Sequence, residues 1–276
     1  MQVVEYEMPW ETVTLCPVGD IQHGSITGDL DRYASHVAWT LNQPNPWYLG
    51  LGDYIDLASP SNRARFAAAN LYDVVPTQLD LVSDRLVTDV VKASRGTERR
   101  WLGALEGHHY WTHMDGTTSD MEFCRRLVAP FLGSSTLVRL KFLRQDGRNS
   151  LTCTIFASHG SGGGQKASAP LNRLENLVAY IDADIYVVGH MSKKAAAPID
   201  QLFVDRAGNL KHRTKLIVGA GGFSQGYKQG SSLGGRAQGS YVEKALMAPV
   251  ALGAPVVTIT PEHTRKEDKL DIHVSL

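Results

Sequence analysis

The chain of 276 residues is poor in cysteine, has no excess charge of either sign and contains no long apolar run. Its three cysteines, Cys16, Cys124 and Cys153, form no close pair, which argues against a disulfide scaffold and a cysteine-based zinc site. Basic and acidic residues balance at 28 each, so no overall field attracts nucleic acid, a membrane surface or an acidic partner. No stretch could span a bilayer, and no basic segment followed by an apolar one marks a secretory signal. These absences predict a cytoplasmic protein with no membrane partner.

The remaining composition is that of a globular protein with a large core. Hydrophobic residues make up 43% of the chain and charged residues 20%, which is ordinary for such proteins. Because α/β chains of this length often form one unit and no repeat or linker interrupts the sequence, we expect a single domain over 1–276. The segment 219–239 contains eight glycines, which predicts either a disordered surface loop or a lid over a functional site.

Strand-like segments recur along the whole chain. Apolar runs that end in turn residues predict core strands, at 13–18, 47–51, 101–105 and 184–188. Paired segments predict two β-hairpins, at 137–157 with a turn at Asp146-Gly147 and at 202–218 with a turn at Ala207-Gly208-Asn209. Strand-like segments also close the chain, at 255–260 and 269–274.

Helical periodicity separates many of these strands, at 30–41, 59–92, 121–132 and 170–181. Ser59 followed by Pro60 is a favourable helix start, because serine caps the first amides and proline suits the first position. We expect the long helical stretch to be interrupted near Pro76. Its later apolar residues share one helical face and should pack on a sheet: Leu79, Val82, Leu86 and Val90. Strands alternating with helices predict an α/β fold.

The most informative stretch is 49–56, Leu-Gly-Leu-Gly-Asp-Tyr-Ile-Asp, where an apolar run ends in Gly52-Asp53. Glycine after a strand lets the backbone turn sharply, so Asp53 should stand at the carboxyl edge of a sheet, where α/β proteins place their sites. Alone, Gly-Asp is a common turn, and Asp56 more simply caps or orients a neighbour than binds metal.

Four other strand ends carry residue types that bind metals, namely Gly19-Asp20, Gly107-His108-His109, His159-Gly160 and Gly189-His190. A carboxylate shared between two cations needs further oxygen and imidazole ligands from several strand ends. The chain supplies both kinds in order. The pattern therefore predicts a metal centre in which Asp53 bridges two ions.

These five stretches resemble the motifs of the calcineurin-like metallophosphoesterase superfamily, which run Asp-x-His, Gly-Asp-x-x-Asp, Gly-Asn-His-Asp/Glu, His and Gly-His-x-His. The resemblance spans Gly19 to about Ser192. It implies a four-layer α/β/β/α sandwich of two mixed sheets flanked by helices, with the metal site at the strand C-terminal loops. The segments 239–245 and 249–253 resemble the ends of phage-encoded members, for which the location would be a host cytoplasm.

The resemblance assigns most ligands of the second metal. Asp53 matches the bridging aspartate, His159 the lone histidine and His190 the first histidine of the last motif. His108 stands where the family has asparagine and is a softer substitute. The second metal thus keeps a complete ligand set, and one strong site is expected.

The first metal keeps Asp20 but lacks two family histidines, because Gln22 and Ser192 occupy their positions. A glutamine carbonyl and a serine hydroxyl suit Mg²⁺ or Mn²⁺ better than Zn²⁺, so this site is expected to be weak. His23 is an alternative donor in place of Gln22. Mn²⁺ is the ion we expect, with Mg²⁺, Zn²⁺ and Fe as alternatives.

The resemblance implies a metal-dependent phosphoester hydrolase. Two cations about 3.5–4 Å apart can acidify a bridging water and hold the phosphoryl oxygens for in-line attack. His109 matches the family histidine that protonates the leaving oxygen. We expect a phosphodiesterase or nuclease, acting on nucleic acid or a nucleotide-like diester, rather than a phosphomonoesterase. A protein phosphatase fits worse, because no arginine directly follows Asp56 or lies close to His109 in the sequence.

A binding scaffold that keeps the fold without catalysis is the rival hypothesis. The replacements at Gln22 and Ser192 favour it, since they remove two imidazole ligands. The presence of His109 opposes it, because a scaffold has no need of a leaving-group acid.

Overall fold

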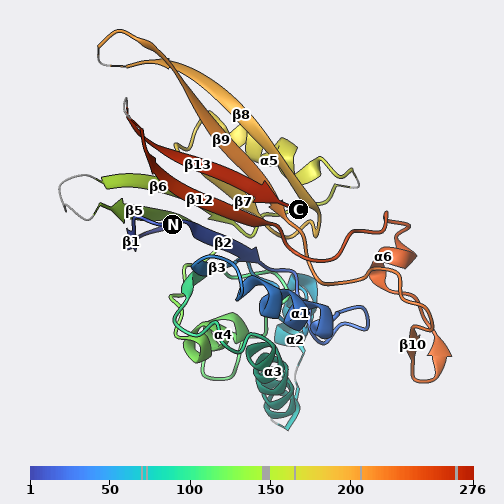
Figure 1. Cartoon of the computed structure of the whole chain (residues 1–276). Coiled ribbons are helices and arrows are strands. Elements are labelled where there is room, and N and C mark those ends of the chain that lie inside the picture. Colours follow the sequence, from blue (N-terminus) through green and yellow to red (C-terminus); the bar gives the residue numbers. More distant parts are fainter. Residues whose placement is uncertain (70, 73, 145–149, 165, 206, 265–266) are drawn as a thin grey trace.

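The computed structural model describes the chain from residue 1 to residue 276 except 70, 73, 145–149, 165, 206 and 265–266. Two β-sheets lie face to face, and helices lie on the outer side of each (Figure 1). Both sheets mix parallel and antiparallel pairs. The expected α/β/β/α sandwich of two mixed sheets flanked by helices is confirmed. The predicted turn at Asp146-Gly147 lies outside the described residues.

The larger sheet has six strands in the order β1-β5-β6-β7-β9-β8. Their bounds are β1 Gln2–Pro9, β5 Ser135–Leu143, β6 Ser150–Ser158, β7 Ile185–Val188, β9 Leu210–Ala220 and β8 Lys194–Val204. Strands β6, β7 and β9 run parallel. The loops that follow β6 and β7 therefore leave the sheet at the same edge.

The smaller sheet has five strands in the order β13-β12-β2-β3-β4. Their bounds are β13 Asp268–Ser275, β12 Val256–His263, β2 Val13–Val18, β3 Pro46–Gly50 and β4 Trp101–Ala104. Strands β2, β3 and β4 run parallel, so the loops after these three strands also meet at one edge.

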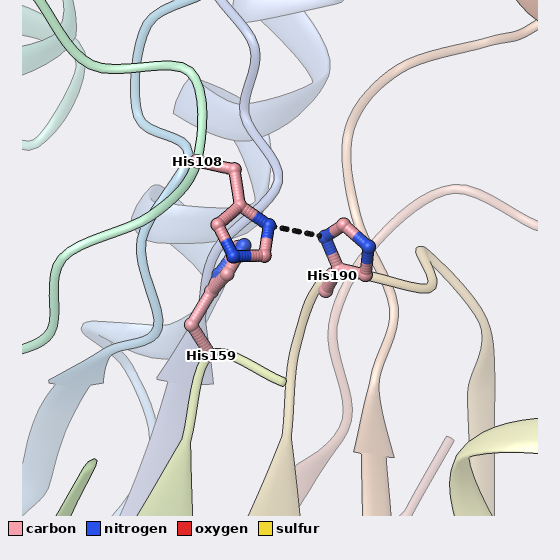
Figure 2. Close-up of side chains that lie close together, drawn as sticks. All are labelled: His108, His159 and His190. Carbon is pink, nitrogen blue, oxygen red and sulfur yellow. Dashed lines mark hydrogen bonds between the residues drawn. The ribbon is translucent and has the colours of Figure 1, made fainter. Parts of the chain in front are cut away.

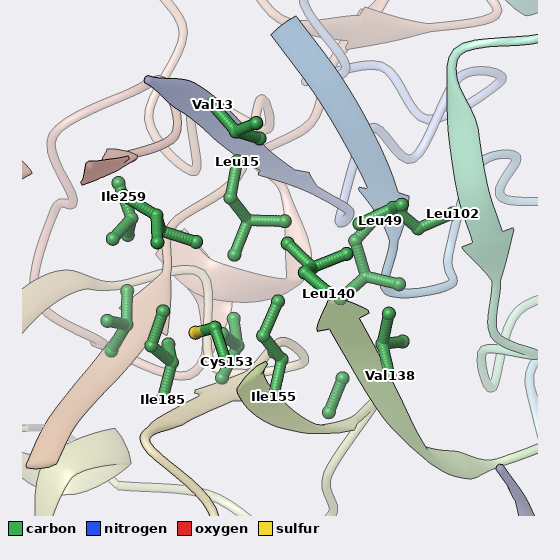
Figure 3. Close-up of a cluster of buried hydrophobic side chains, with 14 of the residues drawn as sticks. Val13, Leu15, Leu49, Leu102, Val138, Leu140, Cys153, Ile155, Ile185 and Ile259 are labelled. Atoms are coloured by element: carbon green, nitrogen blue, oxygen red, sulfur yellow. The ribbon is translucent and has the colours of Figure 1, made fainter. Parts of the chain in front are cut away.

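The core between the sheets is apolar and draws on both of them. Figure 3 shows Val13, Leu15 and Leu49 of the smaller sheet facing Leu140 and Ile155 of the larger one. Successive strand side chains point to opposite faces, so Cys16 and Val18 of β2 face the helices instead. Burial on both faces explains why these strands read as continuous apolar runs.

Three helices cover the smaller sheet: α1 Leu30–Thr40, α3 Val74–Ala93 and α4 Ser119–Leu127. Helix α5 Ala169–Val178 covers the larger sheet through Leu174. Helix α2 Pro60–Ala68 begins as predicted, with the Ser59 side chain accepting a hydrogen bond from the amide of Asn62. Neither α2 nor the short α6, Tyr241–Lys244, has a buried residue.

The interruption predicted near Pro76 is confirmed: α2 ends at Ala68 and α3 begins at Val74, so Pro76 lies in the first turn of α3, where a proline costs no hydrogen bond. Two other helix predictions need correction. The face of α3 that meets the sheet includes Ser83, Val87 and Val90, whereas Val82 is 44% exposed. The helix predicted at 121–132 ends at Leu127, because the next residue turns into the left-handed region.

The glycine-rich segment is partly built into the fold. Its early residues Phe223 and Ser224 are buried. Beyond them, a two-stranded ribbon of β10 Ser232–Leu233 and β11 Arg236–Ala237 extends away from the two sheets (Figure 1).

Candidate metal centre

The predicted metal ligands lie in loops that follow five strands. Asp20, Asp53 and His108 follow β2, β3 and β4 of the smaller sheet, and His159 and His190 follow β6 and β7 of the larger sheet. Because the strands within each set are parallel, their loops gather at one edge of each sheet. The structure brings all five residues into two overlapping groups of potential ligands.

Three imidazoles form the histidine group, which consists of His108, His159 and His190. Their ligand nitrogens all lie within 4.8 Å of one another. The rings meet edge to face with centroids 4.6 to 5.1 Å apart. Nδ1 of His108 lies 3.2 Å from Nδ1 of His190, and the rings turn toward one another (Figure 2). Ring nitrogens that converge in this way can share a cation.

Two carboxylates and one imidazole form the acidic group, which consists of Asp20, Asp53 and His159. Their ligand atoms also lie within 4.8 Å of one another, and His159 Nε2 is 3.5 Å from Asp53 Oδ2. All three residues are at most 2% exposed. His159 belongs to both groups, whereas the sequence motifs gave the shared position to Asp53.

The hydrogen bonds of His159 fix its tautomer. Its Nδ1 lies 2.5 Å from the carbonyl oxygen of Leu51, and a carbonyl only accepts, so Nδ1 carries the hydrogen. In the neutral ring Nε2 then bears the lone pair; this buried atom makes no hydrogen bond to a described residue, although it lies 3.5 Å from Asp53 Oδ2. Asp20 Oδ1 is likewise buried without a partner. Buried acceptors without donors are what a cation satisfies, so these residues fit a divalent ion.

Backbone amides hold Asp53 in a fixed orientation. Its Oδ1 accepts hydrogen bonds from the amides of His108 at 2.5 Å and His109 at 2.9 Å. The approach requires glycine at position 107, where a Cβ would lie 2.1 Å from the Asp53 nitrogen. Oδ1 of Asp53 is thereby bound to the backbone of this loop, and Oδ2 faces His159.

The backbone at the centre is strained. Positive φ angles of 48° to 64° occur at Asp20, Gln22, Asp53, His190 and Ser192. These are five of the nine non-glycine residues with positive φ in the described part of the chain. Such conformations are costly for residues with a Cβ and gather at functional sites. Here each of them lies in one of the five motifs.

The two carboxylates of the acidic group have pKa values shifted in opposite directions. Burial and then the charge of Asp53 raise the pKa of Asp20 well above its usual range. Burial also acts to raise the pKa of Asp53, but His159, His109 and the two amides outweigh it and lower that pKa. Two adjacent buried carboxylates cannot both ionise easily, so the pair retains a proton unless a cation replaces it.

Burial keeps two members of the histidine group uncharged. It lowers the pKa of His190 to about 4, with His159 and His108 adding to the effect. Burial and then His159 lower the pKa of His108. Neutral imidazoles have free lone pairs at neutral pH and are ready to ligate.

His109 differs from its neighbours because it has a carboxylate partner. Its Nδ1 lies 2.7 Å from Asp56 Oδ1, and this hydrogen bond raises the pKa of His109 despite its burial. Asp53 and Asp20 raise this pKa further through their charges. Asp56 thus orients His109, as the simpler sequence hypothesis held. The surroundings therefore favour the protonated form of His109 and the neutral forms of His108 and His190.

The substituted motif positions remain close to the centre. The amide of Gln22 donates to the Asp53 carbonyl oxygen at 2.9 Å, and the amide of Ser192 donates to Asp20 Oδ2 at 3.3 Å. His23 does not take the place of the missing imidazole, because its Nε2 pairs with Asp89 of α3 at 3.4 Å.

Sequence reasoning missed two residues that support the His108 loop. Asp120 is buried and accepts a hydrogen bond from the Gly107 amide at 2.8 Å, and burial raises its pKa to about 7. Arg63 of α2 donates to the carbonyl oxygens of His108 and Tyr110 at 2.7 and 2.9 Å. An aspartate in the first turn of α4 was the available signal for Asp120. Arg63 had none, because its partner is a backbone carbonyl 45 positions away.

No helix in the described part of the chain is both long and apolar enough to cross a membrane. No family model matches the sequence, and no curated protein matches it.

Among solved structures, the chain is similar to vacuolar protein sorting 29 from Cryptosporidium parvum. The identity is 12%, the match covers 96% of this chain and 98% of that one, and the TM-score is 0.37. It is also similar to a Thermotoga maritima protein solved by NMR, at 13% identity over 64% of this chain and 83% of that one, with a TM-score of 0.23. At such TM-scores, neither likeness bears on what this chain does.

Proposed function

We propose that the protein is a metal-dependent phosphoester hydrolase that acts on diesters, with nucleic acid or a nucleotide-like diester as substrate. The observation that carries this proposal is the position of His109. It is held by Asp56 at 2.7 Å, its pKa is raised, and its own amide binds the Asp53 carboxylate at 2.9 Å. A proton donor therefore adjoins two groups of metal ligands without belonging to either.

The residues divide the chemistry among them. His108, His159 and His190 would hold the stronger ion, while Asp20 and Gln22 would hold the weaker one, with Asp53 between them. When bound, divalent ions supply charge neutralisation for the phosphoryl group and an acidified water as nucleophile. His109 donates its proton to the leaving oxygen, and Asp56 orients the imidazole and favours its protonated form. Mn²⁺ is the ion we propose, because it accepts both imidazole and carboxylate ligands.

The test pairs metal content with turnover. The purified protein is analysed for bound metal, and hydrolysis of bis-(p-nitrophenyl) phosphate and p-nitrophenyl phosphate is measured with Mn²⁺, Mg²⁺ and Zn²⁺. We expect diester cleavage that requires an added or bound ion. The matched variant is Asp53→Asn, which keeps the side-chain shape but removes the charge and should reduce turnover on the order of a thousandfold. Cleavage of the monoester alone would overturn the choice of diesters.

A binding scaffold is the second candidate, and the motif substitutions favour it. Ser192 contacts Asp20 through its backbone amide. The position that would supply an imidazole ligand in the family motif supplies none here. If the protein holds no metal and cleaves neither ester with any ion, the scaffold replaces the hydrolase.

A further inference from the structure

A second site lies apart from the metal centre and shares no residue with it. A cavity of about 260 Å³ opens between α1, the start of β8, the segment before β12 and the end of β13. Its lining residues are Arg32, Ser35, His36, Trp39, Lys194, Leu252, Gly253, Ala254, Ser275 and Leu276. The volume is suited to a small molecule or to part of one.

Helix α1 contributes an entire face to this cavity. Arg32, Ser35, His36 and Trp39 follow one another at helical spacing and therefore lie on one side of the helix. The other side of α1 is buried against the smaller sheet, with Tyr33 and Val37 in the core. The cavity face is thus a second face of α1, on which only His36 reaches the core, through its ring contact with Phe223.

The two charged side chains that line the cavity are cationic, and the terminal carboxylate of Leu276 adds one anionic group to the lining. Arg32 and Lys194 have no side-chain hydrogen-bond or ion-pair partner within the described part of the chain, and no lining residue is an aspartate or glutamate. Both cations act on the same imidazole, since burial and then Lys194 and Arg32 lower the pKa of His36 to about 4. Two cationic side chains beside one neutral ring outweigh the single carboxylate of Leu276, and this excess of positive charge favours an anion.

His36 has a buried ring nitrogen without a hydrogen-bond partner in the part of the chain that the structure describes, as a site without its ligand would. Three buried side-chain nitrogen or oxygen atoms lack a hydrogen-bond partner among the described residues. Two of them, in Asp20 and His159, belong to the metal centre, and the third is Nε2 of His36. A buried polar atom without a partner is costly unless a ligand or water completes it. Beside it, Trp39 is 48% exposed and offers a flat apolar surface.

Glycines shape the wall of the cavity. A Cβ at Gly221 would lie 2.4 Å from Cγ of Lys194 and 2.2 Å from the carbonyl oxygen of Gly253. Only glycine at position 221 therefore allows Lys194 and Gly253 to pack this closely against the backbone there. Gly221, in the first part of the glycine-rich segment, thus packs behind two lining residues of the cavity and does not belong to a loose loop.

We propose that this cavity binds a small anionic molecule, with an oxyanion group held by Arg32 and Lys194 and a planar part lying on Trp39. The oxyanion is a phosphate or a carboxylate. The inference does not depend on the proposed hydrolase activity, because none of its residues belongs to the metal centre.

The test is a titration of the full-length protein by calorimetry and by tryptophan fluorescence. The probes are adenosine monophosphate and benzoate, which distinguish phosphate from carboxylate, with adenosine as the uncharged control. We expect one of the two anions to bind and adenosine to bind more weakly. The fluorescence change should disappear in Trp39→Phe while the heat signal remains.

Two charge-removing variants locate the site. Arg32→Gln and Lys194→Met should each weaken binding roughly ten- to hundredfold, as expected for the loss of a charge-assisted contact. The matched control is Arg85→Gln, an exposed arginine of α3 outside the cavity, which should bind like the parent protein. Asp53→Asn should also bind normally, which separates this site from the metal centre. Melting curves verify that each variant is folded.

Three results would overturn the proposal. They are the absence of binding by either anion at millimolar concentration, unchanged affinity in both folded charge variants, and loss of anion binding in Asp53→Asn. The last result would assign the anion to the metal centre.

Discussion

The histidine group and the acidic group share one residue yet offer a metal ion very different surroundings. His108 and His190 are partly exposed, and burial together with neighbouring imidazoles lowers their pKa values so that they are neutral. Asp20 and Asp53 are at most 1% exposed, and the charge of one raises the pKa of the other. His108 and His190 are thus ready to bind without losing a proton, whereas the raised pKa of Asp20 couples binding at the acidic group to the loss of one.

The difference indicates which ions each group prefers. Neutral imidazoles suit Zn²⁺, Fe and Mn²⁺, while carboxylates suit Mg²⁺ and Mn²⁺. Mn²⁺ is common to both sets, which is why we propose it. Binding to the acidic group should also depend more steeply on pH, because ion and proton compete for the same oxygens.

The largest predicted effect comes from a residue outside both groups. His109→Ala should lower diester turnover by about 10²–10⁴, the usual contribution of general acid catalysis, while both groups still bind metal. Steady-state kinetics and elemental analysis of the same preparation measure the two effects. If the variant turns over like the parent protein, His109 has no part in the reaction.

Next in size is a pair of variants that divides the two groups. His190→Ala should weaken the tighter Mn²⁺ site by roughly a hundredfold, and Asp20→Asn should remove only the weaker one. Calorimetric titration of the metal-free protein with Mn²⁺ resolves the two steps. Identical titrations for both variants would mean that the groups form a single site, and the contrast between them would be lost.

A smaller effect is expected from Asp56→Asn, which removes the hydrogen bond that raises the pKa of His109. Turnover at neutral pH should fall on the order of tenfold, the usual size for a partner that orients a functional side chain. The acid form of His109 acts below its pKa, so activity declines as the pH rises through that raised value. In the variant, the decline should begin at lower pH. A pH–rate profile that does not move would remove Asp56 from its positioning role.

The hydrogen bond between Asp56 and His109 should also stabilise the folded protein, and this stabilisation, like the activity, should decrease as the pH rises. Because the folded pKa of His109 lies above its unfolded value, the stabilisation is complete below the unfolded pKa. It is lost as the pH rises through the folded pKa. Melting temperatures of the metal-free parent protein and Asp56→Asn should therefore converge toward high pH.

The smallest predicted effect is an increase in metal affinity. Ser192→His should return an imidazole to the acidic group and raise its affinity for Zn²⁺ by about tenfold or less. Ser192 has a φ of 49°, which histidine tolerates better than most side chains, and its amide already contacts Asp20. Ser192→Leu adds bulk without a ligand and serves as the control. Equal Zn²⁺ affinity in both variants would show that this position does not face the ion.

The strands around the centre could be predicted because their apolar runs are short and end in glycine with a ligand. The edges of the larger sheet could not. Strand β1 pairs in parallel with β5, about 130 positions later, and a partner so distant leaves no local signal. Strand β8 begins at Lys194, although a hairpin was predicted only from residue 202. Its alanines and Pro198 are weak strand formers that an edge position tolerates.

The ligands of the centre were predicted from motifs, but the residues that hold the ligand loops in place were not. Asp120 acts through the Gly107 amide, and Arg63 acts through carbonyl oxygens of the same loop. Side chains that bind backbone atoms follow no spacing rule, because any residue type can supply the amide or carbonyl. The direction of His23 depended on a contact with Asp89 across the fold. These contacts are set by tertiary packing and are not encoded locally.

The contact between His159 and the carbonyl oxygen of Leu51 joins residues 108 positions apart and connects the two sheets. Contacts of such long range are costly to form early in folding, because a long loop must be closed before they are made. The unfolded chain therefore presents no organised set of ligands, and metal should have little influence on the rate of folding. Once bound, however, the ion must be released before the sheets separate. It should therefore act mainly on the rate of unfolding and lengthen the lifetime of the folded protein.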